Sequence, residues 1–170
     1  MNDNIKLKIL TEKYINNDVL KWYFDKEVTK FSDNQHRKLN LNMQKQYIKN
    51  CQLSNSRFLH GIFFDNNYIG NILISNISNY HKTAEISYFI GDKRYWGKGI
   101  MTTVIKMVVH IAKDSLMLNK LYAGVASENY ASIKALEKNN FIKEGKRTQH
   151  LYYNSKYYDQ IDYGLLLNLK

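Results

Sequence analysis

The stretch Tyr88-Phe89-Ile90-Gly91-Asp92-Lys93-Arg94-Tyr95-Trp96-Gly97-Lys98-Gly99-Ile100 decides how this chain folds. It begins as an apolar run, continues through a short basic segment that contains glycines, and ends where a helical pattern starts. The first N–H groups of a helix have no internal partner, and the helix dipole places partial positive charge there. Glycines allow an anion to approach the backbone, and Arg94 and Lys98 add full charges. The stretch therefore predicts a strand, an anion-binding loop and a helix.

The glycine spacing alone is weak, because many ordinary strand-to-helix turns contain Gly-x-Gly. A nucleotide-hydrolysing P-loop is excluded, since no Gly-Lys-Ser/Thr triplet follows the glycines. A dinucleotide fingerprint is also excluded, because its third glycine would fall on Thr102 and the preceding strands form an antiparallel meander.

Strand and helix patterns extend on both sides of this loop. The expected strands are 6–10, 57–64, 68–75, 83–90, 121–126, 141–152 and 159–167. A hairpin turn is expected at Asp65-Asn66-Asn67, since Asn and Asp tolerate positive φ. Thr11 is expected to cap a helix whose apolar positions are Tyr14, Ile15, Val19, Leu20 and Trp22. Further helices are expected at about 42–51, with Met43, Tyr47 and Ile48 inward, from Gly99 onward, and at 129–138.

Length and composition limit the class of protein. The chain has 170 residues, of which 44% are hydrophobic, and we expect one domain over 1–170. No apolar run approaches the roughly 20 residues of a membrane helix, and the first residues lack the apolar core of a signal peptide. Cys51 is the only cysteine, so a reducing cytoplasm is the expected location. The net charge of +10 is compatible with an anionic partner, but the codon bias of an AT-rich genome is the preferred explanation.

The order of motifs resembles one known superfamily. Arg94-x-x-Gly97-x-Gly99 is similar to the R/Q-x-x-G-x-G/A motif that binds the CoA pyrophosphate in GNAT acetyltransferases. Segments 84–90 and 129–141 resemble the family's fourth strand and fourth helix, and 154–166 resembles the closing hairpin of the ribosomal-protein-alanine (RimJ/RimL-type) branch. The likeness covers about 6–167. It implies an α+β GNAT fold, with a mixed, mostly antiparallel sheet of six to seven strands, about four helices, and a splay between strands four and five.

The resemblance also implies the reaction: an acetyl group passes directly from acetyl-CoA to a primary amine, with no metal and no covalent enzyme intermediate. Cys51 is then expected to pack in the core rather than act as a nucleophile. The pantetheine arm is expected between the splayed strands, beside backbone groups near Phe89 and Ile90. The residues expected to contact CoA are Phe89, Ile90, Arg94, Tyr95, Trp96, Gly97, Lys98, Gly99, Ile100, Asn129 and Ser132.

The catalytic residues depart from the commonest family pattern. Leu136 stands where many relatives carry a tyrosine acid, so we expect Ser132 of Asn129-x-x-Ser132 to assist the departing thiolate. A simple structural role for Ser132 at the helix start explains the residue equally well. Glu85 is the candidate base, although an ion-paired sheet residue is the simpler interpretation; His150 is the weaker alternative.

The acceptor is expected to be a small-molecule amine, foremost a nucleotide-linked amino sugar, because the segment Trp22 to Phe31 resembles relatives near sugar-modifying pathways. Protein N-termini and polyamines are the alternative acceptors. The non-enzymatic alternative is a module that binds CoA without catalysing a reaction. A homodimer is compatible with the family likeness. Neither nucleic acid nor a membrane is an expected partner.

Overall fold

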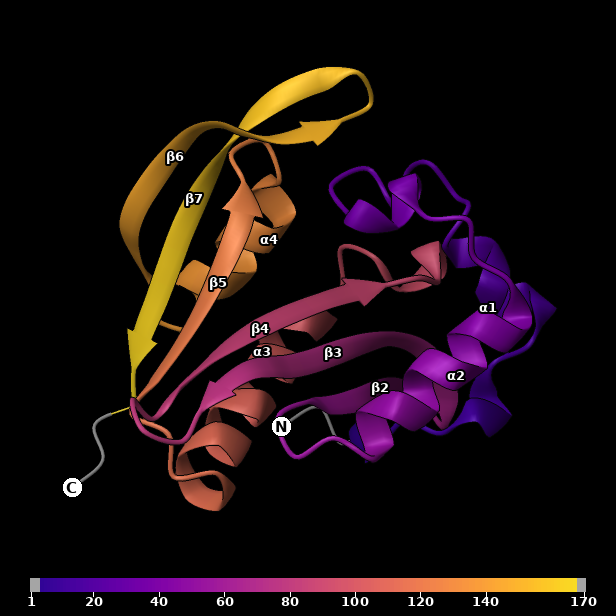
Figure 1. Ribbon diagram of the computed structural model, residues 1–170, viewed down its shortest axis with the longest axis horizontal. Coiled ribbons are helices and arrows are strands. Elements are labelled where there is room, and N and C mark those ends of the chain that lie inside the picture. Colours follow the sequence, from indigo (N-terminus) through magenta and orange to yellow (C-terminus); the bar gives the residue numbers. More distant parts are fainter. Residues whose placement is uncertain (1–3, 168–170) are drawn as a thin grey trace.

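A single sheet of seven strands runs through the chain in the order β1-β2-β3-β4-β5-β7-β6 (Figure 1). The structure is a computed structural model and describes residues 4–167. The strands are β1 (Ile5–Ile9), β2 (Phe58–Phe64), β3 (Asn67–Ser78), β4 (Thr83–Ile90), β5 (Lys120–Ala126), β6 (Ile142–Tyr153) and β7 (Lys156–Leu166). The helices are α1 (Asn17–Trp22), α2 (Leu41–Gln52), α3 (Ile100–His110) and α4 (Tyr130–Glu137). The expected mixed α+β fold is confirmed.

The sheet divides between β4 and β5. These strands are parallel and pair only at Thr83↔Lys120, Ala84↔Leu121 and Glu85↔Tyr122. Beyond that point β4 stays paired with β3 as far as Ile90, while β5 stays paired with β7 as far as Ala126. The two halves of the sheet therefore diverge like the arms of a V (Figure 1), as the family resemblance implied.

The helices cover opposite faces of the sheet (Figure 1). One core joins α3 and α4 to the sheet through residues such as Ile86, Val104 and Leu136. A second core joins α1 and α2 to the other face, where Val19, Ile48 and Leu59 are buried. Because side chains alternate along a strand, the odd-numbered residues of β4 face α1 and α2, and the even-numbered residues face α3 and α4.

The hairpin between β2 and β3 forms at the expected residues. Asp65 and Asn66 have φ of 47° and 65°, in the left-handed region that Asn and Asp tolerate. Pairing of Phe64 with Asn67 closes the turn. The local turn chemistry therefore sets the register of these two central strands.

The predicted start of the first helix is wrong. Thr11 precedes only a short 3-10 turn, Glu12–Tyr14, and its side chain makes no capping bond. Asn16 caps α1 instead, and its Oδ1 accepts hydrogen bonds from the N–H groups of Asp18 and Val19 at 3.0 Å. An Asn side chain can satisfy both free amides, and the helix begins where it does so. Met43 also departs from expectation, since it is 50% exposed on α2.

The connection between α1 and α2, residues 23–40, reaches across to the β6–β7 hairpin (Figure 1). The Tyr153 hydroxyl donates to Asp33 Oδ1 at 3.1 Å, and the Asn154 N–H donates to Gln35 Oε1 at 3.0 Å. His36 Nε2 lies 2.9 Å from the Tyr152 carbonyl oxygen. This connection thus bridges the two halves of the divided sheet. Of the helices within residues 4–167, none is long and apolar enough to cross a membrane.

Candidate active site

A run of free backbone amides marks the start of α3. Within residues 4–167, no hydrogen bond uses the N–H groups of residues 97–102, and the first bond of the helix runs from the Thr103 N–H to the Gly99 carbonyl. Gly97 and Gly99 have φ of 72° and 70°, a conformation that favours glycine. Apart from the adjoining residues of the chain, no heavy atom lies within 4 Å of a Cβ built on either glycine, so this part of the loop borders open space. This arrangement fits an anion of phosphate size.

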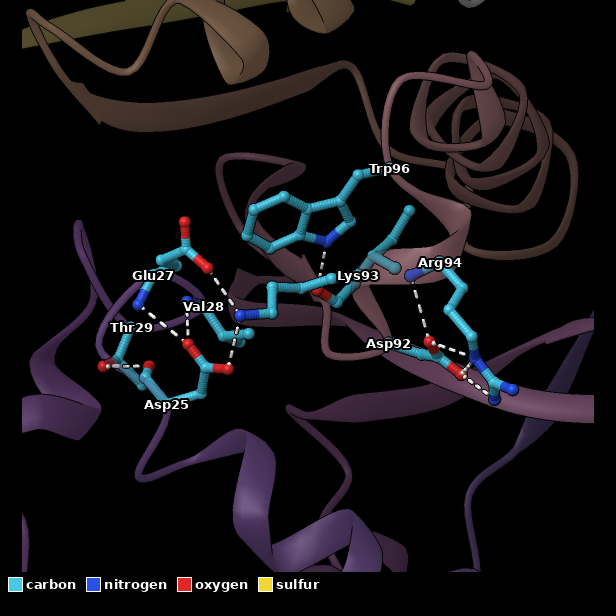
Figure 2. A network of polar contacts seen from close by, with 9 residues as sticks. Asp25, Glu27, Val28, Thr29, Asp92, Lys93, Arg94 and Trp96 are labelled. Atoms are coloured by element: carbon cyan, nitrogen blue, oxygen red, sulfur yellow. Dashed lines mark hydrogen bonds and ion pairs between the residues drawn. The ribbon is translucent and has the colours of Figure 1, made fainter.

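The loop before these amides is held rigidly by its neighbours (Figure 2). The Trp96 indole N–H donates to the Ile90 carbonyl oxygen at 2.8 Å. Lys93 Nζ lies 2.8 Å from Asp25 Oδ2 and 2.5 Å from Glu27 Oε2, which ties the loop to the α1–α2 connection. Hydrogen bonding to Lys93 holds the pKa of Asp25 below its ordinary value. The geometry of the amides is therefore set before a ligand arrives.

Arg94 lies differently from the sequence expectation. Its guanidinium forms a two-pronged ion pair with Asp92, including 2.6 Å from Nη2 to Oδ2, and its side chain is 84% exposed (Figure 2). Arg94 is also absent from the lining of the adjacent groove. The hydrogen bonds from Arg94 lower the pKa of Asp92. In this structure Arg94 stabilises the turn, and its contact with a pyrophosphate stays a prediction.

A groove of about 1420 Å³ runs along the gap between β4 and β5. It brings together residues from every segment that the sequence singled out. Of the predicted site residues, the groove is lined by Glu85, Phe89, Ile90, Tyr95, Trp96, Gly97, Lys98, Gly99, Ile100, Asn129 and Ser132. Leu151 and Tyr153 of β6 also line it, whereas His150 does not. Within residues 4–167, no cluster of His, Cys, Asp and Glu is arranged to hold a metal ion.

The free edge of β4 faces this gap. The Gly91 N–H donates to the Ile69 carbonyl, so the alternating antiparallel ladder turns the backbone of Phe89 toward β3. The backbone groups of Ile86, Tyr88 and Ile90 therefore face β5, where no strand pairs with them. The backbone of Phe89 thus faces β3 rather than the gap, and the Ile90 carbonyl is already bonded to Trp96. An extended ligand would pair chiefly with the edge at Ile86 and Tyr88.

Two hydroxyl groups meet on the α3–α4 side of the gap. The Tyr88 hydroxyl lies 2.8 Å from Ser132 Oγ, and both residues line the groove. Asn129 caps α4, because its Oδ1 accepts the Ser132 N–H at 3.3 Å. Burial raises the pKa of Tyr88 to about 12, and the hydrogen bond with Ser132 opposes that rise. Tyr88 is therefore a neutral hydroxyl at physiological pH.

Sequence reasoning selected Ser132 and missed Tyr88. Side chains alternate between the two faces of β4, and this alternation alone places Tyr88 on the face opposite to Glu85, which is covered by α3 and α4. The contact itself joins residues 44 positions apart, which a strand pattern does not predict.

Glu85 lies on the opposite face of β4, at the last residue pair before the strands diverge. Its Oε2 accepts a hydrogen bond from Asn76 Nδ2 at 2.7 Å. No lysine or arginine within residues 4–167 lies within 4.0 Å of this carboxylate. A carboxylate has further acceptor positions beyond the one that the Asn76 amide occupies.

Comparisons with known proteins agree with this geometry. Residues 8–142 match the family model described as an acetyltransferase (GNAT) domain. The putative ribosomal N-acetyltransferase YdaF of Bacillus subtilis is 33% identical over 106 residues, which cover 62% of this chain and 57% of YdaF. The chain thus spans little more than half the length of such curated relatives, 57% and 56% for two of them.

Solved structures share the whole fold at low sequence identity. The spermidine N-acetyltransferase of Vibrio cholerae, solved with CoA and spermine, has a TM-score of 0.86 at 19% identity and covers 97% of this chain and 96% of its own. The microcin C7 self-immunity acetyltransferase MccE, solved with acetyl-CoA and AMP, has a TM-score of 0.84 at 22% identity, with coverages of 96% and 93%. Because the family model matches most of the chain, including the divided sheet and the start of α3, this chain belongs to the GNAT acetyltransferase family.

Proposed function

We propose that residues 1–170 act as one N-acetyltransferase domain, which transfers the acetyl group of acetyl-CoA directly to a primary amine. One observation carries the proposal. The free amides of residues 97–102 open onto the same groove as the unpaired edge of β4 and the Tyr88–Ser132 hydroxyl pair. A phosphate site, an unpaired strand edge and a pair of hydroxyls thus line one groove, and these are the groups that would bind the pyrophosphate, the pantetheine arm and the reacting end of a CoA thioester.

The residues present fit acetyl-CoA, which supplies the activated acetyl group when bound. The N–H groups of residues 97–102 would hold the pyrophosphate, and Lys98 adds a positive charge on the groove wall. The free backbone edge at Ile86 and Tyr88 would pair with the amides of the pantetheine arm. An N–H of that edge can also donate to the oxyanion that develops during acyl transfer.

The hydroxyl pair is suited to hydrogen bonding more than to complete proton transfer. A thiol has a pKa of about 8.5, and that of Tyr88 is about 12, so protonation of a thiolate by Tyr88 is uphill by about 5 kcal/mol. Ser132 is a weaker acid still. We infer that Ser132 donates a hydrogen bond to the charge developing on sulfur, while Tyr88 donates to Ser132 Oγ and strengthens that donor.

Glu85 is the proposed general base. An ammonium group must lose its proton before it can attack, and Glu85 is a groove-lining carboxylate on the side of the sheet covered by α1 and α2. Glu27 and Glu128, by contrast, are ion-paired with Lys93 and Lys156, whereas Glu85 accepts from the neutral Asn76 amide and Asp33 accepts from the Tyr153 hydroxyl. Glu85 would accept the proton directly or through one water molecule.

The proposed acceptor is a small-molecule amine, foremost a nucleotide-linked amino sugar, and we propose the cytoplasm as the location. A protein of the same fold, MccE, was solved with acetyl-CoA and AMP together, so this fold can hold a CoA thioester and a nucleotide at once. The relative YdaF, named as a putative ribosomal N-acetyltransferase, favours a protein N-terminus as the second candidate.

The test is acetyl-CoA turnover, followed by release of free thiol, with UDP-linked amino sugars, N-terminal peptides of ribosomal proteins and spermidine as acceptors. Acetyl-CoA should also raise thermal stability, by about 2.7 kcal/mol at 100 times its dissociation constant. Turnover with one class of acceptor would establish the activity and the substrate. Absence of stabilisation at millimolar acetyl-CoA would refute the proposal.

A further inference from the structure

The acidic side chains that line the groove have hydrogen-bond or ion-pair partners, whereas the basic ones lack carboxylate partners in the described part of the chain. Each acidic one has a partner: Glu27 and Glu128 pair with lysines, Asp33 accepts from Tyr153, and Glu85 accepts from Asn76. The basic ones differ. Within residues 4–167, no carboxylate lies within 4.0 Å of the groove-lining cations Lys30, Arg37, Lys38, Lys98, Lys134 and Lys138.

These cations form two groups at different places in the fold. Lys98 precedes α3, and Lys134 and Lys138 belong to or follow α4, so this group lies beside the proposed CoA site. Lys30, Arg37 and Lys38 belong to the α1–α2 connection, which covers the other face of β4. One anionic ligand at the start of α3 accounts for the first group only. The second group lines the groove on that other face, on which Glu85 also lies.

A buried hydroxyl that lines the same groove also lacks an acceptor among the described residues. Tyr23 is 5% exposed, and its hydroxyl oxygen accepts from Gln44 Nε2 at 2.8 Å and from Asn71 Nδ2 at 3.2 Å. The Tyr68 hydroxyl donates to Asn71 Oδ1, which fixes the orientation of that amide. Since both amides donate, the Tyr23 hydrogen must point elsewhere, and within residues 4–167 it meets no acceptor. Tyr23, Gln44 and Asn71 all line the groove, so the spare donor is available to a ligand oxygen.

The buried hydroxyl and the cations are close in the fold. Burial raises the pKa of Tyr47, a groove-lining residue of α2, to about 12, and the positive charge of Arg37 opposes the rise. Tyr47 in turn adds to the effect of burial in raising the pKa of Tyr23. Tyr47 therefore lies within electrostatic range of both Arg37 and Tyr23 on the groove wall.

We propose that Lys30, Arg37 and Lys38 form a phosphate subsite for the acceptor, and that Tyr23 donates a hydrogen bond to an oxygen of the same molecule. The inference rests on the proposed function, because it assigns the substrate class of that site: an amine carried on a phosphorylated small molecule such as a nucleotide sugar. Three cations without carboxylate partners disfavour a polyamine at this position through like-charge repulsion.

The experiment measures binding of UMP, inorganic phosphate and uridine by calorimetry, with the protein already saturated by CoA. Saturation occupies the amides of residues 97–102, so added phosphate reports on a second site. UMP is expected to bind, with an affinity that falls as ionic strength rises, and uridine is expected not to bind. Binding of inorganic phosphate as tight as that of UMP would show that the phosphate alone is recognised.

The test variant is Arg37→Gln with Lys38→Gln, and its matched control is Lys26→Gln with Lys45→Gln, which removes the same charge from residues outside the groove. The test variant should lose about tenfold or more in UMP affinity while keeping its CoA affinity, and the control should lose little of either. Tyr23→Phe should also weaken UMP binding. With an amino-sugar nucleotide as substrate, the test variant should show a raised KM and a nearly unchanged kcat.

Two outcomes would overturn the inference: UMP that fails to bind the CoA-saturated protein, or equal loss in the test and control variants. Either result leaves the proposed function standing if peptides or spermidine are acetylated. Failure of CoA itself to bind would refute the proposed function instead.

Discussion

Gly99→Ala tests whether the free amides at the start of α3 hold the CoA pyrophosphate. Gly99 has a φ of 70° and a ψ of 7°, and an L-residue in the left-handed region costs about 1–2 kcal/mol. Alanine recovers about 0.4–1 kcal/mol by restricting the unfolded chain. No atom lies within 4 Å of the added Cβ, so no clash adds to this cost. We expect a net loss of at most about 1.6 kcal/mol and a melting temperature lower by at most about 6 °C.

The effect on CoA should be larger than the effect on folding. The added methyl group would occupy the open space beside Gly99, where an anion would approach the amides, and each charge-assisted hydrogen bond that it displaces contributes about 1.5–3 kcal/mol. One lost contact corresponds to about 10- to 150-fold weaker binding. Calorimetry with CoA, well below the melting temperature, measures this loss separately from stability.

Gly145→Ala is the matched control. Gly145 lies on β6, its φ is not positive, and its added Cβ would come no closer than 3.8 Å to Asp162 Oδ2. This variant should bind CoA like the parent protein. If Gly99→Ala retained full CoA affinity, or if both variants lost affinity equally, the start of α3 would not be the pyrophosphate site.

Further predictions concern the catalytic groups and the charged turns. Glu85→Gln should lower kcat by about 10²- to 10⁴-fold with CoA affinity intact, and unchanged activity across pH would remove Glu85 as the base. Ser132→Ala and Tyr88→Phe should each lower kcat modestly, by about 2- to 13-fold, and the double variant should lose less than the product of the two if the hydroxyls act as a unit. Because burial raises the pKa of Tyr88 to about 12, Tyr88→Phe should leave the shape of the activity profile between about pH 6 and 10 unchanged. The pKa values of Asp25 and Asp92 are lowered by hydrogen bonds from Lys93 and Arg94, so their stabilisation is present above about pH 4 and should be lost on acidification below it, as melting curves at several pH values would show.

The strands and the anion loop could be predicted because they depend on local chemistry. Asp65 and Asn66 suit positive φ, and Gly97 and Gly99 suit an irregular turn before a helix. Each of these features therefore follows from the identity of one or two residues. The start of α1 was missed because Thr11 and Asn16 are both good caps. Only packing decides between them: Ile15 is buried at 3% exposure in an extended conformation, which leaves the helix to begin after it.

The sequence predicted the backbone features of the candidate site, which are the glycine loop and the start of α3, better than it predicted the side-chain contacts. The Asp92–Arg94 ion pair is a contact between residues two apart, yet the family motif suggested a different role for Arg94. The Tyr88–Ser132 pair, the Tyr23 network and the bridge from the α1–α2 connection to β6 and β7 all join distant segments. Their partners become neighbours only when the sheet divides and the helices pack on its two faces.

The alternation of β4 has a chemical consequence. Glu85 and Tyr88 differ by an odd number of positions, so the strand places the proposed base and the hydroxyl pair on opposite faces of the sheet. In a continuous sheet these groups would be separated by hydrogen-bonded backbone. The β4–β5 pairing ends at Glu85, so this barrier is absent beyond that residue. In the proposed reaction, an amine on the α1–α2 side would therefore meet the thioester in the gap between the two strands. A chain with the same residues but a closed β4–β5 ladder would hold both groups and have no place for them to act together.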